Sequence, residues 1–303
     1  MSAPETQDVD ALIVGGGPAG LTCAVYLARY RRKVVVVDGM KSRAAWIPET
    51  HNYPGFADGI AGPRLLDTLR SHAKRYGVSI IHDQVAALQP DGPEFIGTCS
   101  QADVRAKRIV LATGLIDKNV SMPDLKQTVD RGLVRYCPIC DGFEASDLRI
   151  GVLGNADFAA TKALFLRTYS RHVTLLQMDD KPCSVQQSRE LSEAGVRFPK
   201  APVRALAQQE NQIIASMSDG TQEVCDVIYP VLGCDVRSEL GKKLGACHND
   251  SGCLEVDAHQ QTSVAGLYAI GDVVSDLHQI AVATGHAAVA ATHVHNSLPR
   301  NFR

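Results

Sequence analysis

Short apolar runs that end in glycine-containing turns recur along the chain. The first run covers residues 9–14 and leads into a turn with three glycines, after which residues 22–29 have helical character. A second run, K-V-V-V-V at residues 33–37, follows and ends in Asp38. Continuous apolar runs of this length are typical of strands that are buried on both faces of a parallel sheet. The order strand, turn, helix and strand predicts a βαβ unit.

The same pattern returns later in the chain. Residues 149–154 form an apolar run into a turn, and a helix through Leu166 and a strand at residues 172–176 are predicted after it. Two further runs, R-I-V-L-A-T-G at residues 108–114 and G-L-Y-A-I-G-D-V at residues 266–273, each join a strand to a turn of small residues. Strands that alternate with helices predict an α/β fold. We predict two doubly wound, dinucleotide-binding domains of the Rossmann type.

The second predicted domain is inserted in the first. The chain is expected to leave the first domain around residues 116–123 and to return to it near residues 245–252. The first domain should therefore comprise residues 1–116 and 247–303, and the second should comprise residues 117–246.

The first turn carries the spacing G-x-G-x-x-G in Gly15, Gly17 and Gly20. In this fingerprint the first glycine permits a tight turn, the second lets the backbone approach a pyrophosphate, and the third lets the helix pack on the strand. The helix N-terminus then faces the phosphates with its partial positive charge. Asp38 is placed to accept hydrogen bonds from an adenosine ribose. We predict a bound dinucleotide; the alternative is a glycine-rich turn without a ligand.

Composition narrows the class of protein. The chain has 303 residues and a formal net charge of -2, which gives no electrostatic basis for binding nucleic acid or an anionic membrane. Residues 1–10 are polar and acidic, unlike a signal peptide, and no apolar run reaches the roughly 18 residues of a membrane span. We expect a soluble, cytoplasmic protein.

Among nine cysteines, one pair has redox spacing, in the stretch Cys137-Pro138-Ile139-Cys140-Asp141. A C-x-x-C beside βαβ patterns is typical of a redox-active dithiol. Pro138 suits the start of a helix, and a helix N-terminus lowers a thiol pKa and raises the fraction of nucleophilic thiolate. Zinc would need four ligands, and the chain has no second C-x-x-C and no H-x-x-H. We predict a redox pair and no metal, with a structural disulfide as the alternative.

Three motifs occur in a characteristic order: the G-x-G-x-x-G turn, A-T-G at residues 112–114 and G-D at residues 271–272. In this combination the chain resembles the flavoprotein disulfide reductases that have two dinucleotide-binding domains. The segments 38–41 and 51–56, together with C-x-x-C-D, make it similar to the low-molecular-weight thioredoxin reductases over nearly its whole length. The resemblance implies FAD, bound non-covalently at the first glycine motif, and a homodimer.

The resemblance also implies which residues contact the cofactor. Asp272 is expected at the ribityl-phosphate region, and Gln279 and Ile280 begin a helix whose N-terminus points at the isoalloxazine. The expected contacts are Gly15, Gly17, Pro18, Ala19, Gly20, Asp38, Gly39, Met40, Asn52, Val85, Ala112, Thr113, Gly114, Gly271, Asp272, Gln279 and Ile280.

For the dithiol, the resemblance implies three catalytic residues. Cys140 is the thiol that faces the flavin, and Cys137 is the thiol that exchanges with the disulfide of a partner. Asp141 is the proton donor and acceptor. The expected partner is a thioredoxin-like protein or a small dithiol or disulfide substrate.

The second glycine turn departs from the family pattern. Ala156 occupies the position where the backbone must approach a pyrophosphate, and its methyl group is expected to crowd the ligand. Gln177 stands where the internal repeat places the ribose-binding acid, and Asp179 and Asp180 follow it. Guanidinium groups recognise a 2′-phosphate, whereas carboxylates repel it. The sequence argues against NADPH and leaves NADH, a second flavin or no nucleotide open.

The function that these features favour is FAD-dependent thiol/disulfide exchange with a thioredoxin-like partner, by an enzyme whose electron donor is not assigned. Two alternatives stay open. One is an oxygen-dependent oxidase of small-molecule dithiols, and the other is a redox-sensing flavoprotein with little turnover.

Overall fold

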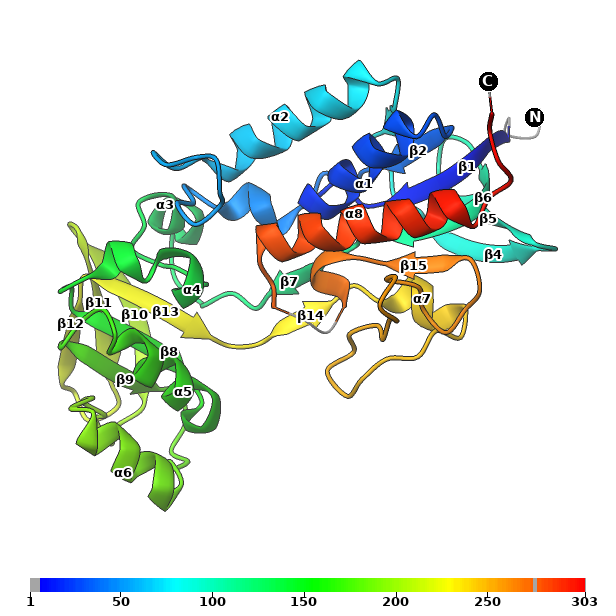
Figure 1. Cartoon of the computed structure of the whole chain (residues 1–303). Helices are drawn as coiled ribbons and strands as arrows, with labels where there is room; N and C mark the ends of the chain where they lie inside the picture. Colours follow the sequence, from blue (N-terminus) through cyan, green and yellow to red (C-terminus); the bar gives the residue numbers. More distant parts are fainter. Residues whose placement is uncertain (1–5, 275–276, 303) are drawn as a thin grey trace. The chain divides into compact units, whose positions relative to one another are not determined.

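The computed structural model describes residues 6–274 and 277–302, and the chain forms two compact units (Figure 1). Unit 1 comprises Met1–Ala45, Ala61–Ile116 and Asp235–Arg303, and unit 2 comprises Trp46–Ile60 and Asp117–Cys234. Unit 1 therefore carries the first glycine turn, and unit 2 carries the cysteine pair.

The chain returns from unit 2 to unit 1 at Asp235, earlier than the boundary that we expected after residue 246. The reason lies in α7 (Glu239–Lys243), because Leu240 packs against the buried core of unit 1. The short segment Trp46–Ile60 also groups with unit 2, which the sequence pattern does not indicate.

Unit 1 is built on a seven-stranded sheet in the order β3-β2-β1-β6-β5-β4, with β15 also paired to β6. Strands β3, β2, β1, β6 and β15 are parallel, and the β4–β5 hairpin joins them antiparallel. The strands are β1 (Gln7–Val14), β2 (Val34–Val37), β3 (Ser79–Ile81), β4 (Ala87–Asp91), β5 (Glu94–Thr98), β6 (Val104–Leu111) and β15 (Leu267–Ala269). The carboxyl ends of β1, β2, β6 and β15 share the edge at which doubly wound folds bind ligands.

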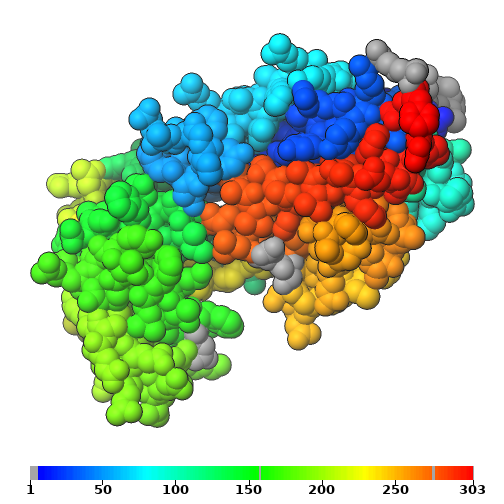
Figure 2. Space-filling view, viewed as in Figure 1, coloured from blue at the N-terminus to red at the C-terminus, as the bar shows by residue number. Residues whose placement is uncertain are grey.

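Both faces of this sheet are buried, as the continuous apolar runs predict. Side chains alternate across a strand, so Ile13 of β1 lies in one core cluster and Leu12 in another. Helices α1 (Pro18–Arg29) and α8 (Ile280–Asn296) pack together over the first face, and Figure 2 shows the orange-to-red surface of α8 against the blue surface of α1. Helix α2 (Gly62–Arg75) packs beside α1.

Unit 2 repeats this plan on a smaller scale. Its parallel sheet has three strands in the order β13-β8-β9, and a second, antiparallel sheet contains β10, β11 and β12. Val152 of β8 lies in one core cluster and Leu153 in another. The elements are α3 (Leu125–Asp130), α4 (Pro138–Asp141), η2 (Phe143–Ala145), β8 (Ile150–Gly154), α5 (Ala156–Leu166), β9 (Val173–Gln177), α6 (Val185–Glu193), β10 (Val203–Gln209), β11 (Gln212–Met217), β12 (Gln222–Cys225) and β13 (Val227–Val231).

The segments that connect the units, β7 (Leu115–Asp117) and β14 (Cys234–Val236), pair with each other in a two-stranded sheet. In the ranges that the structure describes, no helix has both the length and the apolar character needed to cross a bilayer. The parallel sheets with their flanking helices confirm the predicted α/β class with two Rossmann-type domains.

Candidate active site

The glycine turn of unit 1 uses its glycines for two different purposes. Gly15 has φ +116°, and a Cβ built on it would lie 2.2 Å from the Ala112 carbonyl oxygen, while a Cβ on Gly20 would lie 2.0 Å from the Gly15 carbonyl oxygen. These two glycines therefore allow close packing of turn, helix and sheet. Gly17 is the N-cap of the 12-residue helix α1, and a Cβ there would meet only Ser42 Oγ, at 3.3 Å. The space in front of Gly17 thus suits a pyrophosphate at the helix N-terminus.

This difference predicts two distinct outcomes for glycine-to-alanine variants. Gly17→Ala should fold normally but bind FAD about tenfold more weakly or worse, because its methyl group occupies the phosphate-binding space. Gly20→Ala should instead destabilise unit 1, because its methyl group collides with the backbone at Gly15. Flavin absorbance of the purified variants and circular dichroism separate the two effects. Full flavin binding by Gly17→Ala would show that no pyrophosphate lies at this turn.

Asp38 follows β2, and Gly16 allows its close approach, since a Cβ on Gly16 would lie 2.1 Å from Asp38 Cγ. One carboxylate oxygen of Asp38 accepts the Met40 N–H at 2.8 Å, and the other accepts Arg70 Nη2 at 3.2 Å. The Arg70 guanidinium balances this buried charge. A carboxylate has about four acceptor sites, so Asp38 can accept ribose hydroxyls in addition.

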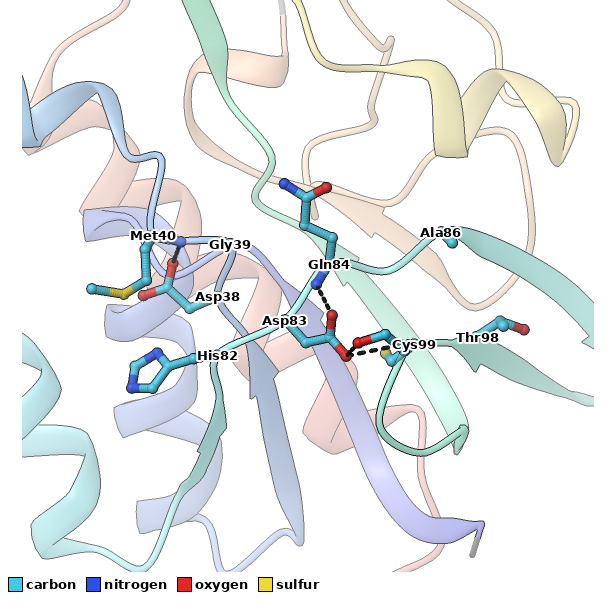
Figure 3. Close-up of a pocket in the computed structure, with 10 residues that line it drawn as sticks. Asp38, Gly39, Met40, His82, Asp83, Gln84, Ala86, Thr98 and Cys99 are labelled. Carbon is cyan, nitrogen blue, oxygen red and sulfur yellow. Dashed lines mark hydrogen bonds between the residues drawn. The ribbon is translucent and has the colours of Figure 1, made fainter. Parts of the chain in front are cut away.

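Asp38, Gly39 and Met40 line a cavity of about 490 Å³ in unit 1 (Figure 3). Across the cavity lies Asp83, which accepts hydrogen bonds from Gln84 N and from the Ser100 hydroxyl and N–H, and these bonds lower its pKa. The side chain of Val85, an expected contact, is instead buried in the core of unit 1, while its neighbours line the cavity.

The A-T-G turn follows β6 directly. The Ala112 N–H donates to the Val14 carbonyl at 2.8 Å, which sets this turn beside the first glycine turn. The Thr113 hydroxyl donates to the Arg237 carbonyl at 2.6 Å, and the Gly114 carbonyl accepts the Arg237 N–H at 2.9 Å. The turn is therefore fixed from both sides within unit 1.

The G-D turn follows β15 and lies against α1. Gly271 has φ +71°, and a Cβ there would come within 2.9 Å of the Ala19 methyl group. Asp272 pairs with Arg43, whose Nη1 lies 3.2 Å from Asp272 Oδ2. Arg43 is the first residue of the 3-10 helix η1 (Arg43–Trp46). The sequence did not single out Arg43, and the pair shows that it brings a cation to the expected phosphate region.

Helix α8 begins at Ile280 with Gln279 as its N-cap, at the predicted residues. His286, one of its inward side chains, accepts the Gly271 N–H at Nδ1 over 3.4 Å and so supports the G-D turn. The structure therefore gathers the first glycine turn, Asp38, the A-T-G turn and the G-D turn at the carboxyl edge of one parallel sheet. This cradle of glycine backbone, helix N-terminus and ribose-binding acid fits FAD.

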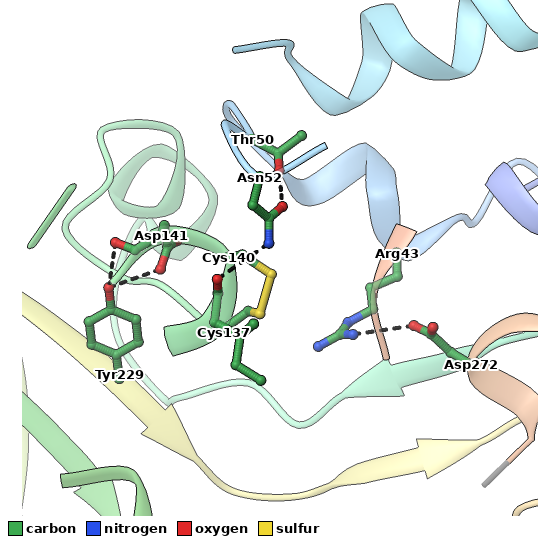
Figure 4. The surroundings of a disulfide bond; sticks show 9 residues. Arg43, Thr50, Asn52, Cys137, Cys140, Asp141, Tyr229 and Asp272 are labelled. Atoms are coloured by element: carbon green, nitrogen blue, oxygen red, sulfur yellow. Dashed lines mark hydrogen bonds and ion pairs between the residues drawn. A yellow bond between two sulfur atoms is a disulfide. The ribbon is translucent and has the colours of Figure 1, made fainter. Parts of the chain in front are cut away.

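The cysteine pair of unit 2 forms a disulfide between Cys137 and Cys140, with a Cα–Cα distance of 5.3 Å (Figure 4). Helix α4 starts at Pro138 as predicted, but it ends at Asp141 and is a single turn. Because the dipole of one turn is small, the expected helix effect on the thiol pKa is also small.

Asp141 is held by two residues from other elements. Tyr229 Oη lies 2.9 Å from Asp141 Oδ1 and 3.1 Å from the Asp141 carbonyl oxygen, and Arg135 Nη1 donates to that carbonyl at 2.8 Å. Burial raises the pKa of Asp141 to about 6, Arg135 and Tyr229 oppose this rise, and Glu144 adds to it. The carboxyl group next to the disulfide can therefore exchange a proton near neutral pH.

Asn52, an expected flavin contact, belongs to unit 2 and lies beside the cysteine pair. Its amide nitrogen donates to the Ile139 carbonyl at 3.3 Å, and its amide oxygen accepts the Thr50 hydroxyl at 2.9 Å (Figure 4). Asn52 thus braces the C-x-x-C turn from a segment far away in the sequence.

The second glycine turn differs from our expectation in one respect. The Ala156 side chain is 3% exposed and packs in the core of unit 2, so its methyl group does not project toward a ligand. Gln177, at the end of β9, is also buried, and its amide nitrogen donates to the Lys181 carbonyl at 3.2 Å. The steric argument from Ala156 is therefore wrong, while the acidic residues at 179 and 180 do follow β9.

Two comparisons of sequence place the chain among known proteins. The pyridine nucleotide-disulphide oxidoreductase family matches residues 9–288. A thioredoxin reductase of Streptomyces coelicolor is 31% identical over 296 residues, covering 93% of this chain and 91% of that protein. A thioredoxin reductase of Mycolicibacterium smegmatis is 30% identical over 303 residues, covering 96% of each.

Solved structures agree with this placement. HlmI has a TM-score of 0.89 and 28% identity, covering 95% of this chain and 92% of its own. The thioredoxin reductase from Streptococcus pyogenes has a TM-score of 0.88 and 27% identity, with 96% and 98% covered. FAD is the cofactor that these similarities imply. The chain therefore belongs to the pyridine nucleotide-disulphide oxidoreductase family, as a thioredoxin reductase-like flavoprotein disulfide oxidoreductase.

Proposed function

We propose that this enzyme passes electrons between FAD, the Cys137–Cys140 pair and a thioredoxin-like protein, and that NADPH is not its electron donor. The observation that carries the exchange reaction is the position of Asp141, a half-buried acid with a pKa of about 6 directly after the disulfide. Thiol/disulfide exchange needs a group that can both give and take a proton at neutral pH, and a carboxyl with an ordinary pKa is a poor donor there.

The reaction balances over two steps. When the pair takes up two electrons and two protons, the Cys137–Cys140 bond breaks and two thiols form. The Cys137 thiolate then attacks the partner disulfide, and the Cys140 thiolate displaces the partner from the mixed disulfide and closes the original bond. Asp141 supplies a proton to the departing thiolate, or accepts one in the reverse direction. Bound FAD would supply or accept the electron pair.

Similarity supports the choice of partner. The relatives from Streptomyces coelicolor and Mycolicibacterium smegmatis are named thioredoxin reductases, and the match covers more than nine-tenths of each chain. A thioredoxin-like protein is therefore the proposed substrate, with a small dithiol or disulfide as the alternative. We also propose that the enzyme is a cytoplasmic homodimer.

The charge after β9 supports the exclusion of NADPH. The turn 177–181 contains Asp179 and Asp180 against one cation, Lys181. A 2′-phosphate at this position would meet net negative charge instead of a guanidinium fork. NADH lacks the 2′-phosphate, so these carboxylates disfavour it less than NADPH. Gln177 could contact its ribose, although its amide N–H already donates to the Lys181 carbonyl.

Anaerobic titration of the purified yellow protein tests the electron donor. We expect that NADPH leaves the flavin oxidised, whereas a dithiol or a chemically reduced low-potential donor bleaches it. Rapid bleaching by stoichiometric NADPH would show that the exclusion is wrong. As a matched gain-of-function control, the double variant Asp179→Arg/Asp180→Arg should gain affinity for NADPH over NADH by about tenfold or more, since each new guanidinium can pair with the 2′-phosphate.

Turnover assays separate the alternatives. Reduction or oxidation of a thioredoxin-like protein supports the proposed function. Hydrogen peroxide released from small dithiols in air, without any nicotinamide, would instead indicate a dithiol oxidase. Flavin that reacts with neither substrate class would indicate a redox sensor.

A further inference from the structure

We propose that Tyr229 is a positioning residue for proton transfer at the dithiol, because its hydroxyl can satisfy the Asp141 carboxyl in both of its protonation states. This inference rests on the proposed function, in which Asp141 moves the proton. Tyr229 comes from the middle of β13, in the buried core of unit 2, and was not a candidate at the level of sequence.

The geometry places one hydroxyl between two acceptors of the same residue. Tyr229 is fully buried, and its Oη lies 2.9 Å from Asp141 Oδ1 and 3.1 Å from the Asp141 carbonyl oxygen (Figure 4). A phenol carries a single proton, so it donates to one of these oxygens at a time. The two distances allow the O–H to turn from one acceptor to the other without movement of the ring.

Each protonation state of Asp141 then has a complete set of hydrogen bonds. When the carboxyl is ionised, the phenol donates to Oδ1, and the carbonyl still accepts Arg135 Nη1 at 2.8 Å. When the carboxyl is protonated, its own O–H donates to the phenol oxygen, and the phenol proton turns to the carbonyl. Neither state leaves a buried donor unpaired, so neither carries the desolvation penalty of an unsatisfied polar group.

The surroundings of Asp141 act on its proton affinity in opposite directions. Arg135 favours the ionised carboxyl, whereas Glu144 and burial favour the protonated one. Arg135 donates through Nη1 to the backbone carbonyl of Asp141, whereas the carboxylate of Asp141 accepts its hydrogen bond from the neutral phenol of Tyr229. A neutral donor stabilises a carboxylate less than a guanidinium does, so the proton stays transferable.

Tyr229→Phe tests the inference because it removes the hydroxyl and keeps the ring in the core. Without this donor, the ionised carboxyl is less stable, so the pKa of Asp141 should rise by about one unit. Infrared difference spectra of the protonated carboxyl, recorded across the pH range on the oxidised holoenzyme, measure that pKa directly, and Asp141→Asn identifies the band. The transition in the pH–rate profile of thiol/disulfide exchange should shift to higher pH by the same amount.

Tyr268→Phe is the matched control, because Tyr268 is a buried tyrosine of unit 1 whose hydroxyl lies 3.0 Å from His293 Nδ1. It should leave the Asp141 band unchanged. An unchanged or lowered pKa of Asp141 in Tyr229→Phe would overturn the inference. A shifted band in an enzyme that exchanges no thiols would support the carboxyl–phenol pair and reject the proposed function.

If Tyr229→Phe does not fold, the wild-type protein gives the same answer. A pH step across the titration of Asp141 should change the infrared band of a tyrosine C–O group, and this change should vanish in Asp141→Asn. A wild-type protein whose tyrosine bands do not respond to that step would overturn the inference.

Discussion

Replacing Cys140 by serine should lower thiol/disulfide exchange by about a thousandfold or more and leave the protein yellow. Serine cannot form the Cys137–Cys140 bond, so electrons have no path between flavin and partner. Flavin binding should survive, because the cradle for FAD lies in unit 1 and the cysteine pair in unit 2. The measurement is the initial rate with a thioredoxin-like protein, alongside the flavin content of the purified variant.

Cys247→Ser is the control for general effects of losing a thiol, since Cys247 is exposed and belongs to unit 1. It should keep wild-type activity. Cys137→Ser should lose exchange with the partner to the same extent as Cys140→Ser. Substantial disulfide reductase activity in Cys140→Ser would contradict the role proposed for this sulfur.

Replacing Asp141 by asparagine should slow exchange by about a hundredfold at neutral pH, because the side chain can no longer carry a proton. The wild-type profile should show a transition near the Asp141 pKa of about 6, and the variant should lose it. If the enzyme reduces its partner, the protonated acid is the active form and the rate falls as the pH rises through that value. If it oxidises its substrate, the carboxylate is the active form and the rate rises instead.

The direction of this transition therefore indicates the direction of electron flow. Asp147→Asn is the control, since Asp147 is an exposed acid of unit 2 in a left-handed turn that asparagine also adopts readily. It should leave both the rate and the profile unchanged. A wild-type profile without any transition in this region would exclude Asp141 as the proton-transfer group.

The parts of the fold that the sequence predicts well are those with local signals. The apolar runs at residues 9–14 and 33–37 became β1 and β2, and both faces of these strands are buried because helices and loops cover them. The turns that follow the strands were found from their glycines and small residues. Since parallel strands share a carboxyl edge, their order alone brings these turns together.

Features that depend on distant partners were missed. Tyr229 lies in an apolar strand, so the sequence pattern indicates only a core residue. Its contact with Asp141 joins residues that are 88 positions apart in the sequence. Arg70 and Arg43 lie in segments without a motif, and only tertiary structure sets them beside Asp38 and Asp272. The Ala156 argument failed for a related reason: a fingerprint position does not say which way a methyl group points.

The hydrogen bond from Asn52 to the Ile139 carbonyl limits how unit 2 could be transferred between proteins as a module. Since Trp46–Ile60 belongs to unit 2, the chain passes between the units at residues 45–46 and 60–61 as well as at 116–117 and 234–235. A gene fragment for residues 117–234 would encode both cysteines but not Asn52. Recombination of one continuous gene segment could therefore not transfer the whole of unit 2. A flavoprotein that acquired only residues 117–234 would gain the dithiol without the hydrogen bond from Asn52 to the Ile139 carbonyl.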